Sequence, residues 1–163
     1  MKGKDGNMQN ERKKLCFIAS SGGHLEQLLM LCPLMDRHDS FIVTEKTQYR
    51  AAFGDRRVCF LRQINRTEWA FPFWMIVNAF SSLRLMIREK PDAVITTGAL
   101  AAVPMCFLAK LFGKKLIYIE TFAKVWSPTM TGKLMYRFAD QFYVQWESML
   151  KIYPKAIWLG GIY

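Results

Sequence analysis

The folded part of this chain is expected to open on Leu15-Cys16-Phe17-Ile18-Ala19-Ser20-Ser21-Gly22-Gly23-His24, which joins an apolar strand, a glycine-rich turn and the start of a helix. A turn of this kind after a parallel strand presents backbone N–H groups and the positive end of a helix dipole, which favour an anion. Glycine also lets the backbone turn sharply and approach a ligand closely. The pattern therefore predicts a phosphate site with Ser21, Gly22 and Gly23 as ligands; a purely architectural turn is the alternative.

Beyond this turn, the chain alternates between strand-like and helix-like segments. Several of the strands are short, apolar throughout and rich in Val, Ile and aromatic residues, which is typical of strands buried on both faces. Right-handed crossovers between such strands produce a parallel sheet covered by helices on both faces. The sequence predicts a doubly wound, Rossmann-like α/β fold. Its expected strands are 15–20, 41–44, 58–62, 93–97, 115–120, 141–145 and 156–159, and its expected helices are 24–35, 73–89, 100–112, 131–138 and 147–153, with a weaker one near 47–53.

The length of 163 residues and the hydrophobic content of 52% predict one domain with a substantial core. We expect residues 15–163 to form that domain. Residues 1–14 are polar and basic, and the apolar run after them is too short for a secretory signal. We expect them to form a disordered leader, which either adds positive charge near an anionic membrane or is simply solvated.

The net charge of +10 predicts an acidic partner, either nucleic acid, anionic lipid or a phosphorylated substrate. Nucleic acid is disfavoured because the basic residues are spread along the chain, without a recognition helix or an aromatic RNA-binding signature. The four cysteines lack metal-binding spacing and are typical of reduced thiols. Walker and dinucleotide-binding motifs are absent from the sequence. We therefore predict neither a metal nor a cofactor, and disfavour kinases, ATPases and dehydrogenases.

Two further polar loops are expected beside the glycine-rich turn. The strand 93–97 ends in Thr96-Thr97-Gly98, and the strand 115–120 ends in Glu120-Thr121-Phe122-Ala123-Lys124. Ligands of doubly wound sheets bind outside the carboxyl ends of the strands, where these loops meet. Each loop alone has a structural explanation, but their convergence predicts a binding site that includes Thr97, Gly98 and Lys124.

The segment 69–87 is apolar and carries a single charge, Arg84. Its length is enough to span a bilayer, but the α/β alternation requires a crossover helix here. Three interpretations remain open: a buried crossover helix, an interfacial helix with its aromatic end in lipid, or a true span. Clustered aromatic rings beside basic residues are typical of a membrane-surface protein. The predicted membrane contacts are Trp69, Phe71, Phe73 and Trp74.

The chain also resembles a known family along residues 15–163. The resemblance is strongest over residues 118–156. The motifs that carry it are Ser20-Ser21-Gly22-Gly23-His24-Leu25, Ile95-Thr96-Thr97-Gly98, Val103-Pro104, Lys115-Leu116-Ile117-Tyr118-Ile119-Glu120, Thr131-Gly132-Lys133-Leu134, Phe138-Ala139-Asp140, Val144-Gln145-Trp146 and Tyr153-Pro154-Lys155-Ala156. They resemble the asparagine-linked glycosylation protein fourteen family, and most of all its bacterial members called PssD or CpsF, from exopolysaccharide and capsule gene clusters.

The resemblance implies the amino-terminal half of a two-domain GT-B glycosyltransferase, present as a separate polypeptide. Its partner would be a catalytic subunit that carries the nucleotide-sugar domain. This chain would dock at the cytoplasmic face of the cell membrane, as a peripheral or monotopic protein, and bind a lipid-diphosphate acceptor. Two departures from the family stand out: a polar leader replaces the transmembrane helix of eukaryotic members, and Lys124 replaces the usual arginine, which removes a bidentate donor.

A division of labour follows as a hypothesis. The diphosphate of a polyprenyl-linked sugar would meet the glycine-rich turn. His24 would accept the proton of the attacking hydroxyl as general base, and Glu120 is the alternative base. His24 could instead orient the phosphate or cap the helix. Two rival functions remain open: a stand-alone α/β enzyme acting on a phosphorylated or nucleotide substrate, and a purely structural membrane adaptor.

Overall fold

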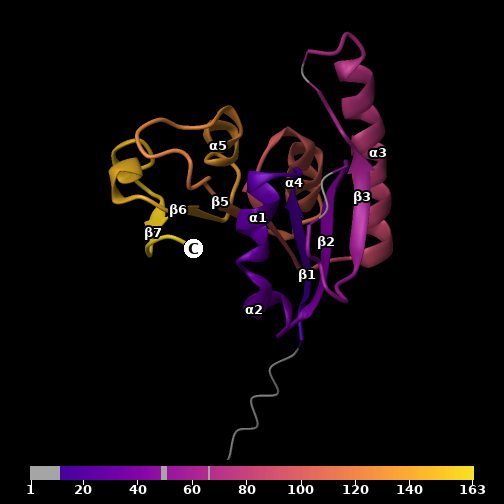
Figure 1. The fold of residues 1–163 in the computed structure, drawn as a ribbon, viewed down its shortest axis with the longest axis horizontal. Coiled ribbons are helices and arrows are strands. Elements are labelled where there is room, and N and C mark those ends of the chain that lie inside the picture. Colours follow the sequence, from indigo (N-terminus) through magenta and orange to yellow (C-terminus); the bar gives the residue numbers. More distant parts are fainter. Residues whose placement is uncertain (1–11, 49–50, 66) are drawn as a thin grey trace, which may run out of the picture.

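The computed structural model describes residues 12–48, 51–65 and 67–163. They contain one seven-stranded parallel sheet in the order β3-β2-β1-β4-β5-β6-β7 (Figure 1). The order runs outward from β1 on both sides, which is the arrangement of a doubly wound fold. The strands are β1 Lys14–Ala19, β2 Asp39–Lys46, β3 Val58–Arg62, β4 Ala93–Gly98, β5 Lys115–Ile119, β6 Gln141–Val144 and β7 Ile157–Trp158. Most of the expected leader, residues 1–11, lies outside the described residues.

Helices cover both faces of this sheet, as the alternating pattern predicts. On one face, α1 and α2 pack against β1, β2 and β4; on the other, α3 and α4 pack against each other and against the sheet. The helical elements are α1 Gly23–Leu29, α2 Cys32–Met35, α3 Phe71–Glu89, η1 Leu100–Ala102, α4 Val103–Leu111, α5 Met130–Met135 and η2 Glu147–Lys151, where η marks a 3₁₀ helix. The predicted α/β class and doubly wound topology are confirmed.

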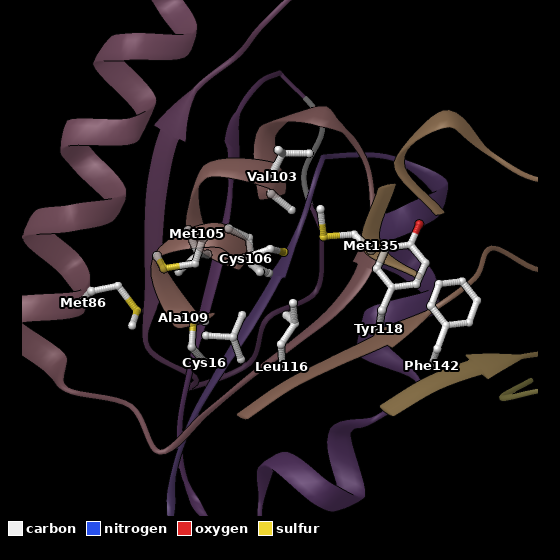
Figure 2. Close-up of a cluster of buried hydrophobic side chains, with 14 of the residues drawn as sticks. Cys16, Met86, Val103, Met105, Cys106, Ala109, Leu116, Tyr118, Met135 and Phe142 are labelled. Atoms are coloured by element: carbon white, nitrogen blue, oxygen red, sulfur yellow. The ribbon is translucent and has the colours of Figure 1, made fainter. Parts of the chain in front are cut away.

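The larger core lies between the sheet and the α3–α4 face (Figure 2). Met105, Cys106 and Ala109 of α4 are buried against Cys16 of β1 and Leu116 of β5. Cys106 and Ala109 present small side chains to the sheet, which lets α4 lie close to it, in keeping with the close packing of protein interiors. Burial raises the pKa of the Cys106 thiol to about 12, which keeps this cysteine a neutral core residue.

Several expected helices differ from the observed ones. The helix expected over 100–112 is divided into the 3₁₀ helix η1 and α4, and the one expected over 131–138 is the shorter α5. The single helix expected over 24–35 is two helices, α1 and α2, because Pro33 begins a new first turn and lacks the N–H that a continuous helix needs. The segment expected as helix 147–153 is the 3₁₀ helix η2. The weaker helix near 47–53 is wrong for residues 47–48 and 51–53, which are not helical; residues 49–50 lie outside the described residues.

The helix α3 connects β3 to β4, and it is the crossover helix that the alternation of strands and helices requires. Asn78 on its inner face is fully buried and bonds both backbone groups of Arg62, donating to the carbonyl at 2.7 Å and accepting from the N–H at 3.1 Å. Its outer face exposes large apolar side chains, Phe73, Ile76, Phe80 and Ile87. Within the residues that the structure describes, no helix is both long and apolar enough to cross a membrane.

Candidate functional site

An open cleft of about 500 Å³ lies at the carboxyl edge of the sheet. The carboxyl-terminal part of β2 and the loops that follow β1, β3, β4 and β5 all contribute to its walls. Its lining residues are Ser20, His24, Glu45, Ile64, Ala99, Leu100, Ala101, Lys124, Pro128, Thr129, Met130 and Thr131. The sequence thus predicted the location of the cleft, together with two of its charged or titratable residues, His24 and Lys124.

His24 and Thr97 hold the first and second predicted loops together. The ring Nδ1 of His24 lies 2.9 Å from the carbonyl oxygen of Thr97, and the Thr97 hydroxyl donates to the carbonyl oxygen of His24 at 2.6 Å. A carbonyl oxygen can only accept, so Nδ1 must carry a proton in this arrangement. In the neutral ring, Nε2 then has the free lone pair, which is the form that a general base needs.

The glycines at the cleft are required by the backbone. Gly22 has φ of 84°, and its carbonyl oxygen accepts the N–H groups of Leu25 and Glu26 at the start of α1. Gly98 has φ of 101°, and a Cβ there would lie only 2.7 Å from the hydroxyl of Tyr118. A positive φ favours glycine, so both positions have a structural reason for their residue.

The predicted phosphate ligands of the first two loops flank the cleft but are not among its lining residues. These are Ser21, Gly22, Gly23, Thr97 and Gly98. The helix that begins at Gly23, α1, has seven residues and is too short to contribute a strong dipole. Of the predicted anion-binding groups, Lys124 therefore has the most direct access to a ligand in the cleft.

Glu120 has a different environment from the one expected of a base. It is 1% exposed, and it accepts hydrogen bonds from the Thr129 hydroxyl at 2.9 Å and from the Tyr153 hydroxyl at 3.0 Å. Gly132 completes the enclosure, because a Cβ on it would overlap the Glu120 carboxylate. Glu120 therefore anchors the start of α5, and it does not line the cleft.

Lys124 lies in the third predicted loop, which other contacts fix in place. The Gln27 amide of α1 donates to the Thr121 hydroxyl at 3.3 Å, and the Trp146 indole N–H donates to the carbonyl oxygen of Phe122 at 2.7 Å. These bonds link the third loop to the first loop's helix and to the end of β6. The convergence of the three loops is confirmed by these contacts together with the His24–Thr97 pair.

Glu45 is a cleft residue that the sequence analysis missed. It is the last buried residue of β2. Its side chain is 8% exposed, and its carboxylate accepts a hydrogen bond from the backbone N–H of Ile64 at 2.8 Å. Burial raises the pKa of its carboxyl above the ordinary value, while hydrogen bonds from the backbone N–H groups of Ile64 and Ser21 lower it. The signal was present in the sequence: Glu45 comes directly after the expected strand 41–44, just as Thr97 and Glu120 are the last residues of theirs.

The aromatic segment before and within α3 lies apart from the cleft's charged walls. Trp69 is 96% exposed and Phe73 is 57% exposed, whereas Phe71 and Trp74 are half-buried. The Arg62 guanidinium stacks over the Trp74 ring, 3.3 Å from its centroid. The loop before α3 and the first turns of this helix form one end of the molecule (Figure 1, top right). In the described part of the chain, no group of three His, Cys, Asp or Glu side chains is placed to hold a metal ion.

The fold is that of one half of a GT-B protein. MurG from Acinetobacter baumannii superposes with a TM-score of 0.67 and 20% identity over 83% of this chain and 42% of its own. A UDP-N-acetylglucosamine 2-epimerase from Rickettsia bellii superposes with a TM-score of 0.71 and 14% identity over 93% of this chain and 45% of its own. The chain thus spans less than half the length of either structure, in agreement with the amino-terminal half expected from the resemblance.

Sequence comparison identifies the family. The family model described as "Oligosaccharide biosynthesis protein Alg14 like" matches residues 56–162, which is more than half of the chain. The chain belongs to this Alg14-like family. It is 28% identical to the UDP-N-acetylglucosamine transferase subunit ALG14 of Mus musculus, over 93% of this chain and 84% of the relative. The family predicted from the motifs is confirmed.

Proposed function

We propose that this chain is the membrane-docking, acceptor-binding subunit of a two-protein glycosyltransferase. The complex would transfer a sugar from a UDP-sugar to a polyprenyl-diphosphate-linked saccharide. The partner would be a catalytic subunit that carries the nucleotide-sugar domain. This assignment is supported by membership of the Alg14-like family and by the name of the mouse relative, which describes a transferase subunit.

The observation that carries the proposal is the state of His24 in the cleft. Its Nδ1 is bonded to the Thr97 carbonyl oxygen, so its Nε2 is the atom available to accept a proton. A sugar hydroxyl of the acceptor that enters the cleft would donate to Nε2 and be deprotonated as it attacks the donor sugar. Glu120 is the weaker choice of base because Thr129 and Tyr153 already donate to its carboxylate.

The acceptor's diphosphate would bind on the Lys124 side of the cleft. The Lys124 ammonium supplies a positive charge there, and the neighbouring turns at Ser21, Gly22, Gly23, Thr97 and Gly98 lie at the same edge. Within these turns the N–H groups of Ser21 and Gly98 already donate to Glu45 and to the Thr96 hydroxyl, so Gly22 and Gly23 are the better candidates for N–H contacts. Because these turns flank the cleft, we assign them secondary contacts to the diphosphate and give Lys124 the main one.

Docking to the membrane would use the start of α3. Trp69 and Phe73 expose aromatic rings, and Phe71 and Trp74 lie next to them. Such rings favour the headgroup region of a bilayer, and the net charge of +10 favours an anionic surface. We propose peripheral or monotopic attachment at the cytoplasmic face of the cell membrane, where a UDP-sugar is available to the complex.

The setting of bacterial exopolysaccharide or capsule synthesis is also part of the proposal. It rests on the sequence resemblance to the PssD and CpsF proteins. The transferred sugar and its linkage are left open, since the motifs are shared by transferases of different sugars.

The test is to purify the chain alone and together with the product of a neighbouring gene that resembles the carboxyl-terminal half of a GT-B transferase. We expect turnover of a UDP-sugar and a polyprenyl-diphosphate saccharide only with both proteins present. The same complex with His24→Ala is the matched control for contaminating transferase. Robust turnover by the isolated chain would exclude the split enzyme and favour the stand-alone α/β enzyme.

A further inference from the structure

Three charged or titratable side chains line the cleft at different strands of the sheet. Glu45 is the next-to-last residue of β2, His24 follows β1, and Lys124 lies in the loop after β5. The sheet order places β1 and β4 between β2 and β5. With about 4.8 Å between neighbouring strands, the Glu45 and Lys124 ends are separated by about 14 Å along the edge. His24 therefore lies between a carboxylate wall and a cationic wall.

Glu45 is held rigidly at its end of the cleft. The backbone N–H groups of Ile64 and Ser21 bond its carboxylate, and the separation of about 14 Å between the strand ends keeps it from pairing with Lys124. A carboxylate is an acceptor for sugar hydroxyls and repels a phosphate oxygen. The two ends of the cleft thus differ in what they can bind.

An apolar pocket of about 330 Å³ adjoins the cleft on its α5 side. The two cavities share Leu100, Met130 and Thr131, and the pocket extends to Phe71 at the start of α3. Met130 begins α5, which follows the Lys124 loop in the chain. An apolar chain leaving a diphosphate near Lys124 would therefore find a continuous path of apolar side chains toward the aromatic segment.

We propose that Glu45 sets the direction in which the acceptor lies in the cleft. The saccharide would face Glu45, the attacking hydroxyl would lie at His24, the diphosphate would face Lys124, and the first lipid units would follow the pocket toward Phe71. Glu45 acts here as a specificity residue, because it accepts hydroxyl groups and excludes the diphosphate from the wrong end. This proposal rests on the acceptor-binding role proposed above.

The experiment uses the isolated chain and inorganic pyrophosphate, followed by NMR at low ionic strength. In the wild-type protein, we expect the amide shifts to change most in residues 121–131 and least in residues 44–46. Lys124→Gln should weaken binding about threefold to tenfold. Glu45→Gln should tighten it about twofold to fivefold, because one repelling charge about 14 Å away is removed, and added salt should shrink this gain.

Two variants serve as controls. Glu45→Asp keeps the charge and should bind pyrophosphate as the wild type does, which separates charge from a rearranged loop. Asp55→Asn removes an exposed negative charge just before β3, at the opposite edge of the parallel sheet, and should change nothing. The spectra and melting temperatures of the free proteins confirm that each variant is folded.

Each other outcome overturns the proposal. If Glu45→Gln binds no more tightly while Lys124→Gln binds more weakly, the diphosphate site stands and the role of Glu45 is wrong. If the wild-type shifts centre on residues 44–46, the acceptor lies in the opposite direction; this mapping requires no variant. If the wild type does not bind pyrophosphate, or Lys124→Gln has no effect, both this inference and the diphosphate site of the proposed function fail.

Discussion

The backbone carbonyl of Thr97 accepts a hydrogen bond from the ring of His24 at 2.9 Å, and the Thr97 hydroxyl returns one to the His24 carbonyl at 2.6 Å. The pair connects the end of β4 with the first turn of α1, across 73 residues of chain. It selects one tautomer of the imidazole and one position of the loop. If His24 is the general base, its chemistry depends on both bonds.

Replacing His24 by alanine should lower turnover of the complex about 10²–10⁴-fold, which is the usual contribution of a general base. Thr97→Val removes the hydroxyl bond but keeps the carbonyl that selects the tautomer, so we expect a smaller loss, about tenfold. Steady-state kinetics of the complex measure both. Near-normal turnover of a correctly folded His24→Ala complex would leave this loop a structural role only.

The glycine-rich turn offers a contrast between two adjacent residues. Gly22 has a φ of 84°, whereas Gly23 has an ordinary backbone and open space around its Cα. Gly22→Val should therefore destabilise the isolated chain by about 1–2 kcal/mol, and Gly23→Ala should leave its melting temperature almost unchanged. Thermal unfolding of the isolated chain checks this difference.

Activity tests the second role of the same turn. If the backbone must approach the diphosphate closely, Gly23→Val should abolish turnover of the complex even though its chain folds. Full activity of Gly23→Val would show that the turn is architectural, the alternative that its sequence left open.

The buried carboxylate of Glu120 makes Gly132 one of the least replaceable positions of the chain. A Cβ at position 132 would overlap the Glu120 carboxylate and crowd the hydroxyls of Thr129 and Tyr153. We expect Gly132→Ala to destabilise the chain by about 2–4 kcal/mol, as overpacking at a rigid site does. Urea unfolding of the purified chain measures the loss.

Tyr153→Phe is the matched control for this site. It removes one donor to Glu120 and adds no atoms, so we expect a loss of about 1–2 kcal/mol, smaller than that of Gly132→Ala. Equal losses for the two variants would contradict the steric explanation.

The sequence was sufficient for the features that depend on periodicity and chain order. The seven strands, the doubly wound topology and the meeting of the loops after β1, β4 and β5 were predicted, because apolar runs and turn residues mark them locally. The break between α1 and α2 could also have been predicted from the sequence, since Pro33 lies within the expected helix.

Other features of the site depend on tertiary packing. Glu120 was expected at the cleft because it ends a strand, but only the packed structure shows Gly132 and Tyr153 closing over it. Glu45 also lies near the end of a strand, yet its place in the cleft depends on how the loop at Ile64 folds back. A polar residue at a strand end thus predicts the correct edge, and its neighbours from distant segments decide whether it faces a ligand.

The last prediction concerns the aromatic segment 69–74, just before and at the start of α3. Replacing Trp69, Phe71, Phe73 and Trp74 together by serine should weaken flotation of the chain with liposomes of anionic lipid. The electrostatic contribution of the +10 net charge should fade with salt, because screening limits its range to about 8 Å at physiological ionic strength, while the aromatic contribution should persist. We therefore expect the largest difference between wild type and variant at high salt.

The control for this experiment removes apolar surface of similar exposure elsewhere. Leu111 at the end of α4 is 80% exposed, and Leu159 after β7 is 81% exposed. The double variant Leu111→Ser, Leu159→Ser therefore tests whether any exposed apolar side chain contributes to lipid binding. This control should float as well as the wild type. Equal flotation of all three proteins at every salt concentration would make the aromatic segment an ordinary part of the surface. If none of them floats until the catalytic partner is added, the partner supplies the membrane contact.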